Sequence, residues 1–128
     1  MTALSDVIAS CHCAIYTYGV AAGFIAQPNI ALDCQADYRI LRDALIEKAT
    51  ALKLPVPAAE AAYKLPIEIS NSQTAVTVCA QLENSLSAQF ADFLSSESAI
   101  EYSDFTSTPQ RCALRGYKWS GVSYAFPA

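Results

Sequence analysis

The sequence predicts an all-α protein, a four-helix bundle, and three observations support this fold class. Apolar residues recur at helical spacing in four segments, over residues 5–27, 30–54, 72–96 and 98–120. Three prolines separate the second segment from the third, and only one triplet alternates as a strand would. The hydrophobic fraction, 53%, is enough to bury a core at 128 residues. Residues 1–128 are therefore expected to form a single domain.

The charge balance argues against a nucleic-acid partner. The chain has a net charge of −4 and contains no run of lysine or arginine to meet phosphates. Five cysteines, an odd number without a Cys-x-x-Cys motif, predict a reduced, cytoplasmic protein. A zinc site or redox pair at Cys11, His12 and Cys13 is disfavoured, because neighbouring residues on a helix point to different sides.

The first helix is expected to begin near Ser5 as N-cap and to end near Gln27, since Pro28 disfavours helix before it. His12 borders its apolar face. The members of that face are Ile8, Cys11, Ile15, Tyr18, Ala22 and Ile25.

An almost uncharged stretch over residues 7–26 leaves a transmembrane alternative, with glycines at Gly19 and Gly23. His12, Thr17, the tyrosines and the missing basic flank count against it. We therefore expect no membrane span, and a core helix whose glycines let a neighbour approach closely.

The second helix is expected over residues 30–54, antiparallel to the first because the turn at 27–29 is short. Arg42 lies on the edge of its apolar stripe. That stripe comprises Cys34, Tyr38, Leu41, Leu45, Ala49 and Leu52.

A long connection follows, over residues 54–70. Pro57 is expected to open a short helix through Tyr63, and residues 67–69 alternate as an extended piece would. At about 3.3 Å per extended residue, roughly 17 residues reach the length of a helix of about 30 Å. This connection therefore predicts a crossover from one end of the bundle to the other.

The third helix carries a buried charge. Asn71 or Ser72 is expected to cap it, and it ends near Ser95 or Ser96. Glu83 lies in the middle of its apolar stripe, where a carboxylate must find a partner or reach a cavity. The other members of the stripe are Val76, Cys79, Leu86, Phe90 and Phe93.

The fourth segment is less regular. Pro109 either kinks a helix or starts a new one, and the tail over residues 122–128 is expected to dock. Arg111, Arg115 and Lys118 share one side. Apolar contacts are expected from Ile100, Phe105, Cys112, Leu114 and Trp119. Two short turns around one long crossover predict the ferritin-like arrangement of four helices.

Four stretches of the chain resemble one family. Residues 11–19, Cys-His-Cys-Ala-Ile-Tyr-Thr-Tyr-Gly, are similar to its first-helix motif Glu-His-Ala-Ala-x-Tyr-x-Tyr-Gly. Residues 38–45, Tyr-Arg-Ile-Leu-Arg-Asp-Ala-Leu, are similar to His-Arg-x-Arg-Arg-Asp-x-Leu. Residues 57–66 resemble an Ala-rich crossover ending in Tyr-x-Leu-Pro, and residues 119–127 resemble Trp-x-Gly with a closing Ala-Phe-Pro. The chain thus resembles the bacterial ferritin-like family called domain of unknown function 4439.

The resemblance implies a fold and no activity. The family's first-helix Glu falls on Cys11, and its second-helix His falls on Tyr38. Any polar site that those two residues make in relatives is therefore expected to be weakened in this chain.

No metal and no cofactor are predicted. Di-iron carboxylate bundles use a Glu from each of two helices and a Glu-x-x-His from each of the other two. This chain has one histidine, His12, and no Glu-x-x-His. A site with fewer ligands from Glu83 and His12 remains an alternative, against a buried, hydrogen-bonded His12.

Glu83 is expected to pair with an arginine from another helix. Arg42 is the first choice, and Arg111 and Arg115 are the other candidates. With His12 they form the predicted central polar cluster. No catalytic residue is assigned, because Ser-His-Asp sets and phosphate loops are absent from the sequence.

Two classes of function follow. The first is a non-enzymatic bundle that associates as a homodimer, indicated by surplus aromatic residues at Tyr16, Phe24, Tyr117, Tyr124 and Phe126. The alternative is a small-molecule-binding or enzymatic bundle with a central pocket of Glu83, His12 and an arginine. The sequence favours the first, and leaves open whether the protein is an enzyme.

Overall fold

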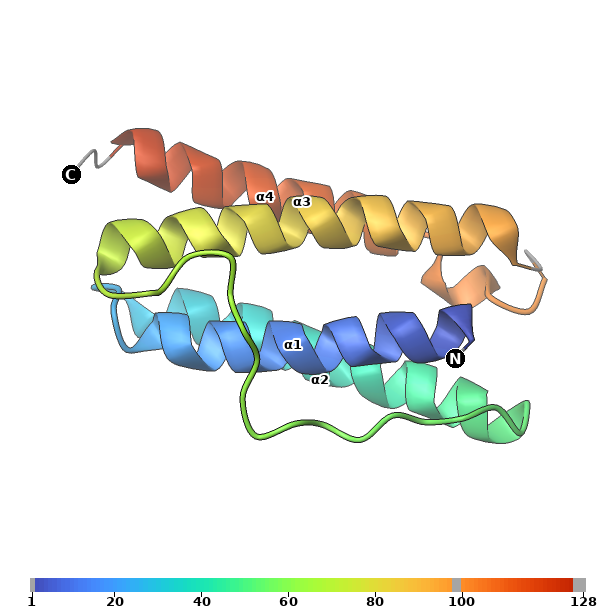
Figure 1. Cartoon of the computed structure of the whole chain (residues 1–128). Coiled ribbons are helices and arrows are strands. Elements are labelled where there is room, and N and C mark those ends of the chain that lie inside the picture. The colour runs from blue at the N-terminus through green and yellow to red at the C-terminus, as the bar shows by residue number, and fades with distance from the viewer. Residues whose placement is uncertain (1, 98–99, 126–128) are drawn as a thin grey trace.

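The computed structural model describes residues 2–97 and 100–125, with side chains described as far as residue 121. Four α-helices occupy most of this part of the chain, and it contains no β-strand. The prediction of an all-α protein is therefore confirmed, and the arrangement in Figure 1 is consistent with a four-helix bundle. The elements are α1 (Ala3–Ala22), α2 (Pro28–Ala51), α3 (Ser72–Ser96), the short 3₁₀ helix η1 (Ser103–Phe105) and α4 (Thr108–Ala125).

The first helix begins earlier than predicted. Thr2, not Ser5, is the N-cap, and its hydroxyl accepts a hydrogen bond from the Ser5 amide at 3.0 Å. The Ser5 hydroxyl instead donates to the Pro55 carbonyl at 3.0 Å. Ser5 is therefore buried, and it fastens the connection after α2 to the start of α1.

The second helix includes Pro28 as its first residue, where a missing amide hydrogen costs nothing. It ends at Ala51, three residues before the predicted end. Lys53 adopts a left-handed conformation with φ of 59°, and the Leu54 amide donates to the Ala49 carbonyl at 2.9 Å. This left-handed turn closes the helix in the manner of a Schellman motif.

Residues 52–71 connect α2 to α3 without any helix. The short helix predicted over residues 57–63 was wrong, because a lone turn opened by proline gains too little to offset its nucleation cost. The Tyr63 hydroxyl accepts instead from the Glu60 amide at 3.0 Å. In Figure 1 the segment runs from the right-hand end of α2 to the left-hand end, where α3 begins.

The third helix begins as the sequence predicts, whereas the fourth, expected from residue 98, begins only at Thr108. Asn71 caps α3 in a reciprocal capping box, since its side chain accepts from the Thr74 amide at 2.8 Å. Pro109 lies in the first turn of α4, so it starts a helix and does not kink one. The predicted docking of the tail falls partly on residues 126–128, which lie outside the described residues.

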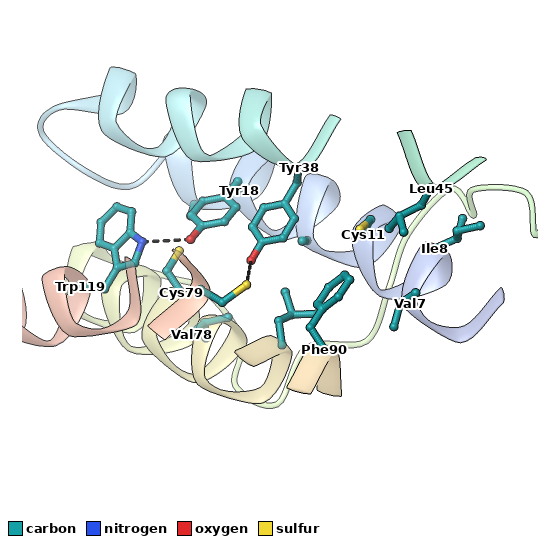
Figure 2. Close-up of a cluster of buried hydrophobic side chains, with 14 of the residues drawn as sticks. Val7, Ile8, Cys11, Tyr18, Tyr38, Leu45, Val78, Cys79, Phe90 and Trp119 are labelled. Atoms are coloured by element: carbon teal, nitrogen blue, oxygen red, sulfur yellow. Dashed lines mark hydrogen bonds between the residues drawn. The ribbon is translucent and has the colours of Figure 1, made fainter. Parts of the chain in front are cut away.

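The core lies between two packed helix pairs, α1 with α2 and α3 with α4, which are joined chiefly through α1 and α3. Figure 2 shows Val7, Ile8 and Leu45 at one end of the buried cluster, and Trp119 at the other. No helix among the described residues is long and apolar enough to cross a membrane, which counts against the transmembrane alternative.

Gly116 marks a close approach of α4 to α3. A Cβ atom at Gly116 would lie 2.6 Å from Asn84 Oδ1 and 3.3 Å from Glu83 Cβ. Asn84 is exposed and can move aside, but Glu83 is fixed in the core. Gly121, on the same helix, has no atom within 4 Å of such a Cβ.

We predict that Gly116→Val destabilises the fold by about 1–3 kcal/mol, since the branched side chain overpacks the contact with Glu83. Gly121→Val is the matched control and should leave stability nearly unchanged, because it meets no neighbour. Urea unfolding followed by circular dichroism measures both. Equal effects of the two substitutions would contradict this close approach.

Candidate functional site

The site is built around Glu83, which lies on α3 among the apolar residues Cys79, Leu86 and Phe90. Its side chain is fully buried, at 0% exposure. A carboxylate only accepts hydrogen bonds, so it can be stable here only if donors surround it.

Three donors, each from a different helix, meet the carboxylate. Tyr18 of α1 donates its hydroxyl hydrogen to Glu83 Oε2. Tyr38 of α2 donates to Glu83 Oε1 at 2.5 Å, and Arg115 Nε of α4 donates to Oε2 at 2.9 Å. Each of the four helices thus contributes one residue to what we call the Glu83 cluster: Tyr18, Tyr38, Glu83 and Arg115.

Further side chains hold these donors in place. Trp119 Nε1 donates to the Tyr18 hydroxyl oxygen at 3.0 Å, an interaction that Figure 2 shows. The Tyr38 hydroxyl lies 3.3 Å from Cys112 Sγ. The Arg115 guanidinium lies over the Tyr38 ring, 4.8 Å from its centroid.

Arg115 also connects the cluster to the surface. Its Nη1 lies 3.6 Å from Asp37 Oδ2, and Asp37 is largely exposed. The arginine side chain itself is only 16% exposed. The outer ion pair is therefore weak, whereas the inner one with Glu83 lies away from solvent.

Burial keeps the tyrosines protonated. It raises the pKa of Tyr18 and Tyr38 far above the ordinary value of 10.0, and the nearby charge of Glu83 raises it further. The unfolded chain can release these protons above about pH 10 and the folded chain cannot. This contribution to stability is thus present below pH 10 and declines as the pH rises beyond it.

Burial disfavours the thiolate form of the cysteines. All five are free, and burial raises the pKa of Cys11 and Cys79 to about 12. The pKa of the half-buried Cys13 is raised as well, again mainly by burial. The three groups therefore stay as thiols at neutral pH and behave as small apolar residues.

The structure brings together only part of the predicted central polar cluster. Glu83 and Arg115 form an ion pair. The prediction that Arg42 is the first-choice partner of Glu83 was wrong. Arg42 Nε instead pairs with Asp43 at 3.1 Å, because that edge of α2 turns towards α1 and the connection. Arg111 is exposed, and no ion pair joins it to Glu83 among the described residues.

His12 lies away from the Glu83 cluster. It is 7% exposed, and its Nε2 lies 3.0 Å from the Pro57 carbonyl oxygen, so the expectation of a buried, hydrogen-bonded histidine is confirmed. It lines a separate cavity between α1, α2 and the connection. Glu83 does not line the cavity that His12 and Arg42 share.

Sequence reasoning missed Tyr18 and Tyr38 as the hydroxyl partners of Glu83. It placed both on apolar stripes, and the signal was available there. A tyrosine in a buried stripe brings a hydroxyl that needs a partner, and Glu83 was the buried acceptor.

The donor set does not fit a di-iron group. Both oxygens of Glu83 accept from protein donors, and the Arg115 cation occupies the position next to the carboxylate. Among the residues that the structure describes, no group of three or more His, Cys, Asp and Glu could hold a metal ion. Iron ligation needs several such ligands converging on one point.

Comparisons with known proteins agree with the fold. The family model described as domain of unknown function DUF4439 matches residues 3–128. The crystal structure of a conserved hypothetical protein, Rv2844, from Mycobacterium tuberculosis is similar with a TM-score of 0.90 and 26% sequence identity. The likeness covers 98% of this chain and 91% of that one. No curated protein is significantly similar to the chain.

We predict that Glu83 and Arg115 are energetically coupled. Glu83→Leu or Arg115→Leu alone should destabilise the fold by about 3–5 kcal/mol, because each strands the charge of the other in the core. The double substitution should recover much of that loss. Urea unfolding of the four proteins measures the coupling.

Arg42→Leu is the control for this cycle, since the one ion pair of Arg42 within the described part of the chain is with the exposed Asp43. It should cost less than about 1 kcal/mol, as surface ion pairs do. Strictly additive losses for Glu83 and Arg115, or a large loss for Arg42→Leu, would contradict the assignment of Arg115 as partner.

Proposed function

The chain belongs to the DUF4439 family, and we propose that it is a ferritin-like bundle which acts by protein association, as a homodimer, and not by di-iron chemistry. The connection over residues 52–71 serves as the crossover of a single domain in this proposal. Its support is the direction of that segment in Figure 1. The arginine beside Glu83 supports the lack of a di-iron site. Free cysteines support a reducing, cytoplasmic location.

The outer face of α4 carries the proposal. Leu114 and Tyr117, three residues apart, are 54% and 78% exposed. The cations Arg111 and Lys118 flank them, and the sequence of α4 contains no acidic residue. An apolar pair with a cationic border is a surface suited to a partner with an acidic border.

The outer face of α2 offers that complementary surface. Ile40 is 70% exposed. At helical spacing of three and seven residues around it lie four exposed acidic residues: Asp33, Asp37, Asp43 and Glu47. A twofold dimer repeats each contact, so α4 of each copy would meet α2 of the other.

Aromatic surplus was the first reason to expect association, and its members lie in different places. Tyr117 belongs to the exposed face of α4, and Phe24 is 41% exposed. Tyr16 packs instead against Tyr63, with ring centroids 5.7 Å apart. The side chains of Tyr124 and Phe126 lie outside the described residues.

We predict that the protein sediments as a dimer, and that replacing both Leu114 and Tyr117 with Ser shifts it to monomer. The substitutions remove the apolar centre of the interface, where most binding energy resides. Sedimentation equilibrium over a range of protein concentrations measures the mass.

Ile100→Ser is the matched control, since Ile100 is 89% exposed and lies outside both faces. It should leave the dimer intact. Raising the salt concentration should weaken the wild-type dimer, because its charged borders are screened. A monomer at every concentration would disprove the proposed association.

A further inference from the structure

The connection over residues 52–71 is held to the bundle by little apolar packing. None of residues 52–68 is buried, and Ile69 is the one buried side chain of the segment. A segment with few buried apolar contacts opens locally at a small cost in free energy. The contacts that the connection makes with α1 are therefore important for keeping it closed.

Three side chains at helical spacing on α1 make those contacts. Ser5 donates to the Pro55 carbonyl at 3.0 Å, and Tyr16 packs against the Tyr63 ring. His12 lies between Ser5 and Tyr16 on the same helix, and it also contacts the connection. Of these three residue types, histidine is the one that changes its charge between about pH 5 and 8.

The surroundings of His12 suit its neutral ring. The Pro57 carbonyl can only accept, so the hydrogen bond at 3.0 Å places the ring proton on Nε2. Nδ1 is buried and has no hydrogen-bond partner among the described residues. A second proton would make Nδ1 a charged donor without an acceptor, and a buried group of that kind is costly. The closed connection therefore excludes the proton that a solvated ring takes up.

Charged groups near the ring do not change this sign. The cavity that His12 lines has two charged residues in its lining, Arg42 from α2 and Glu60 from the connection. Arg42 repels a positive ring, whereas Glu60 attracts it but is exposed to solvent. The two tyrosines of the lining, Tyr16 and Tyr63, carry no charge at neutral or acid pH. Neither α3 nor α4 contributes to the lining, so the missing acceptor at Nδ1 decides the effect.

We propose that His12 makes the connection an acid-released strap, closed on α1 while the ring is neutral and released when the ring takes up a proton. The released form binds one proton more than the closed form. The stability of the closed form is therefore complete at neutral pH and declines as the pH falls, by at most about tenfold in the closing equilibrium per pH unit. Release uncovers the face of α1 beneath the connection. This device is independent of the proposed dimer, which uses the outer faces of α2 and α4.

The test compares the full-length protein at about pH 7 and about pH 5. His12 is the only histidine in the chain, and carboxylates with ordinary pKa values stay mostly ionised over this range. The ring nitrogen-15 resonances report protonation of His12, and backbone nitrogen-15 relaxation reports the mobility of residues 56–68. We expect these amides to become mobile as the ring gains its proton, while the helical circular dichroism signal is unchanged.

Two substitutions of His12 separate the proton from the hydrogen bond. His12→Gln is the matched control, because its amide keeps an N–H donor for the Pro57 carbonyl but does not titrate. It should leave the connection ordered at both pH values. His12→Ala removes the donor and should leave the connection mobile at both. A wild-type connection that is equally ordered at the two pH values, or a pH response that persists in His12→Gln, would overturn the proposal.

Discussion

The pairing of Glu83 with Arg115, Tyr18 and Tyr38 is the interaction on which the rest of the bundle depends. A charged group cannot be left unpaired in a core, and its partners here come from three other helices. Each helix must therefore keep the rotation and height at which its side chain reaches the carboxylate. Apolar packing alone tolerates many such arrangements, whereas three directed hydrogen bonds tolerate few.

The backbone is adapted to this contact. Gly116 lets α4 approach α3 at the level of Glu83, next to the arginine that pairs with it. Trp119, one turn further along α4, donates to Tyr18 and so connects α4 to α1. Residues 115–119 of α4 thus supply the close approach to α3, the cation that pairs with Glu83 and the hydrogen bond to Tyr18. The carboxylate and its arginine neutralise each other without any added ion.

The sequence predicted the helices well and the side-chain partners less well. Helical spacing located the first three helices, and Asn71 marked the start of α3 correctly, since caps depend on local chemistry. The fourth helix was expected from residue 98 but begins at Thr108, and of the two alternatives for Pro109 the structure has the helix start. The first helix was predicted to end near Gln27 but ends five residues earlier, at Ala22. Pro28 restricts only the residue before it, so it does not fix where the helix ends. The short helix at residues 57–63 was wrong because proline permits a helix start without stabilising the turn that follows.

The difference between local chemistry and tertiary arrangement also explains which parts of the site were predicted. Glu83 was found because a carboxylate within an apolar stripe is conspicuous, and an arginine partner follows from its charge. Arg115 could not be distinguished from Arg42, because the choice depends on how α2 and α4 are rotated about their axes. His12 was assigned to the centre for the same reason. In the folded protein the face of α1 that carries His12 is turned to the cavity beneath the connection.

The measurement that tests the Glu83 cluster most directly is an ultraviolet titration of tyrosine ionisation. The wild type is compared with the double variant Tyr18→Phe, Tyr38→Phe, so that the difference reports these two hydroxyls alone. The account predicts that neither ionises while the helices remain folded, and that both ionise together when alkaline pH unfolds the protein. Ionisation of these two tyrosines near pH 10, with the helical circular dichroism signal intact, would contradict it.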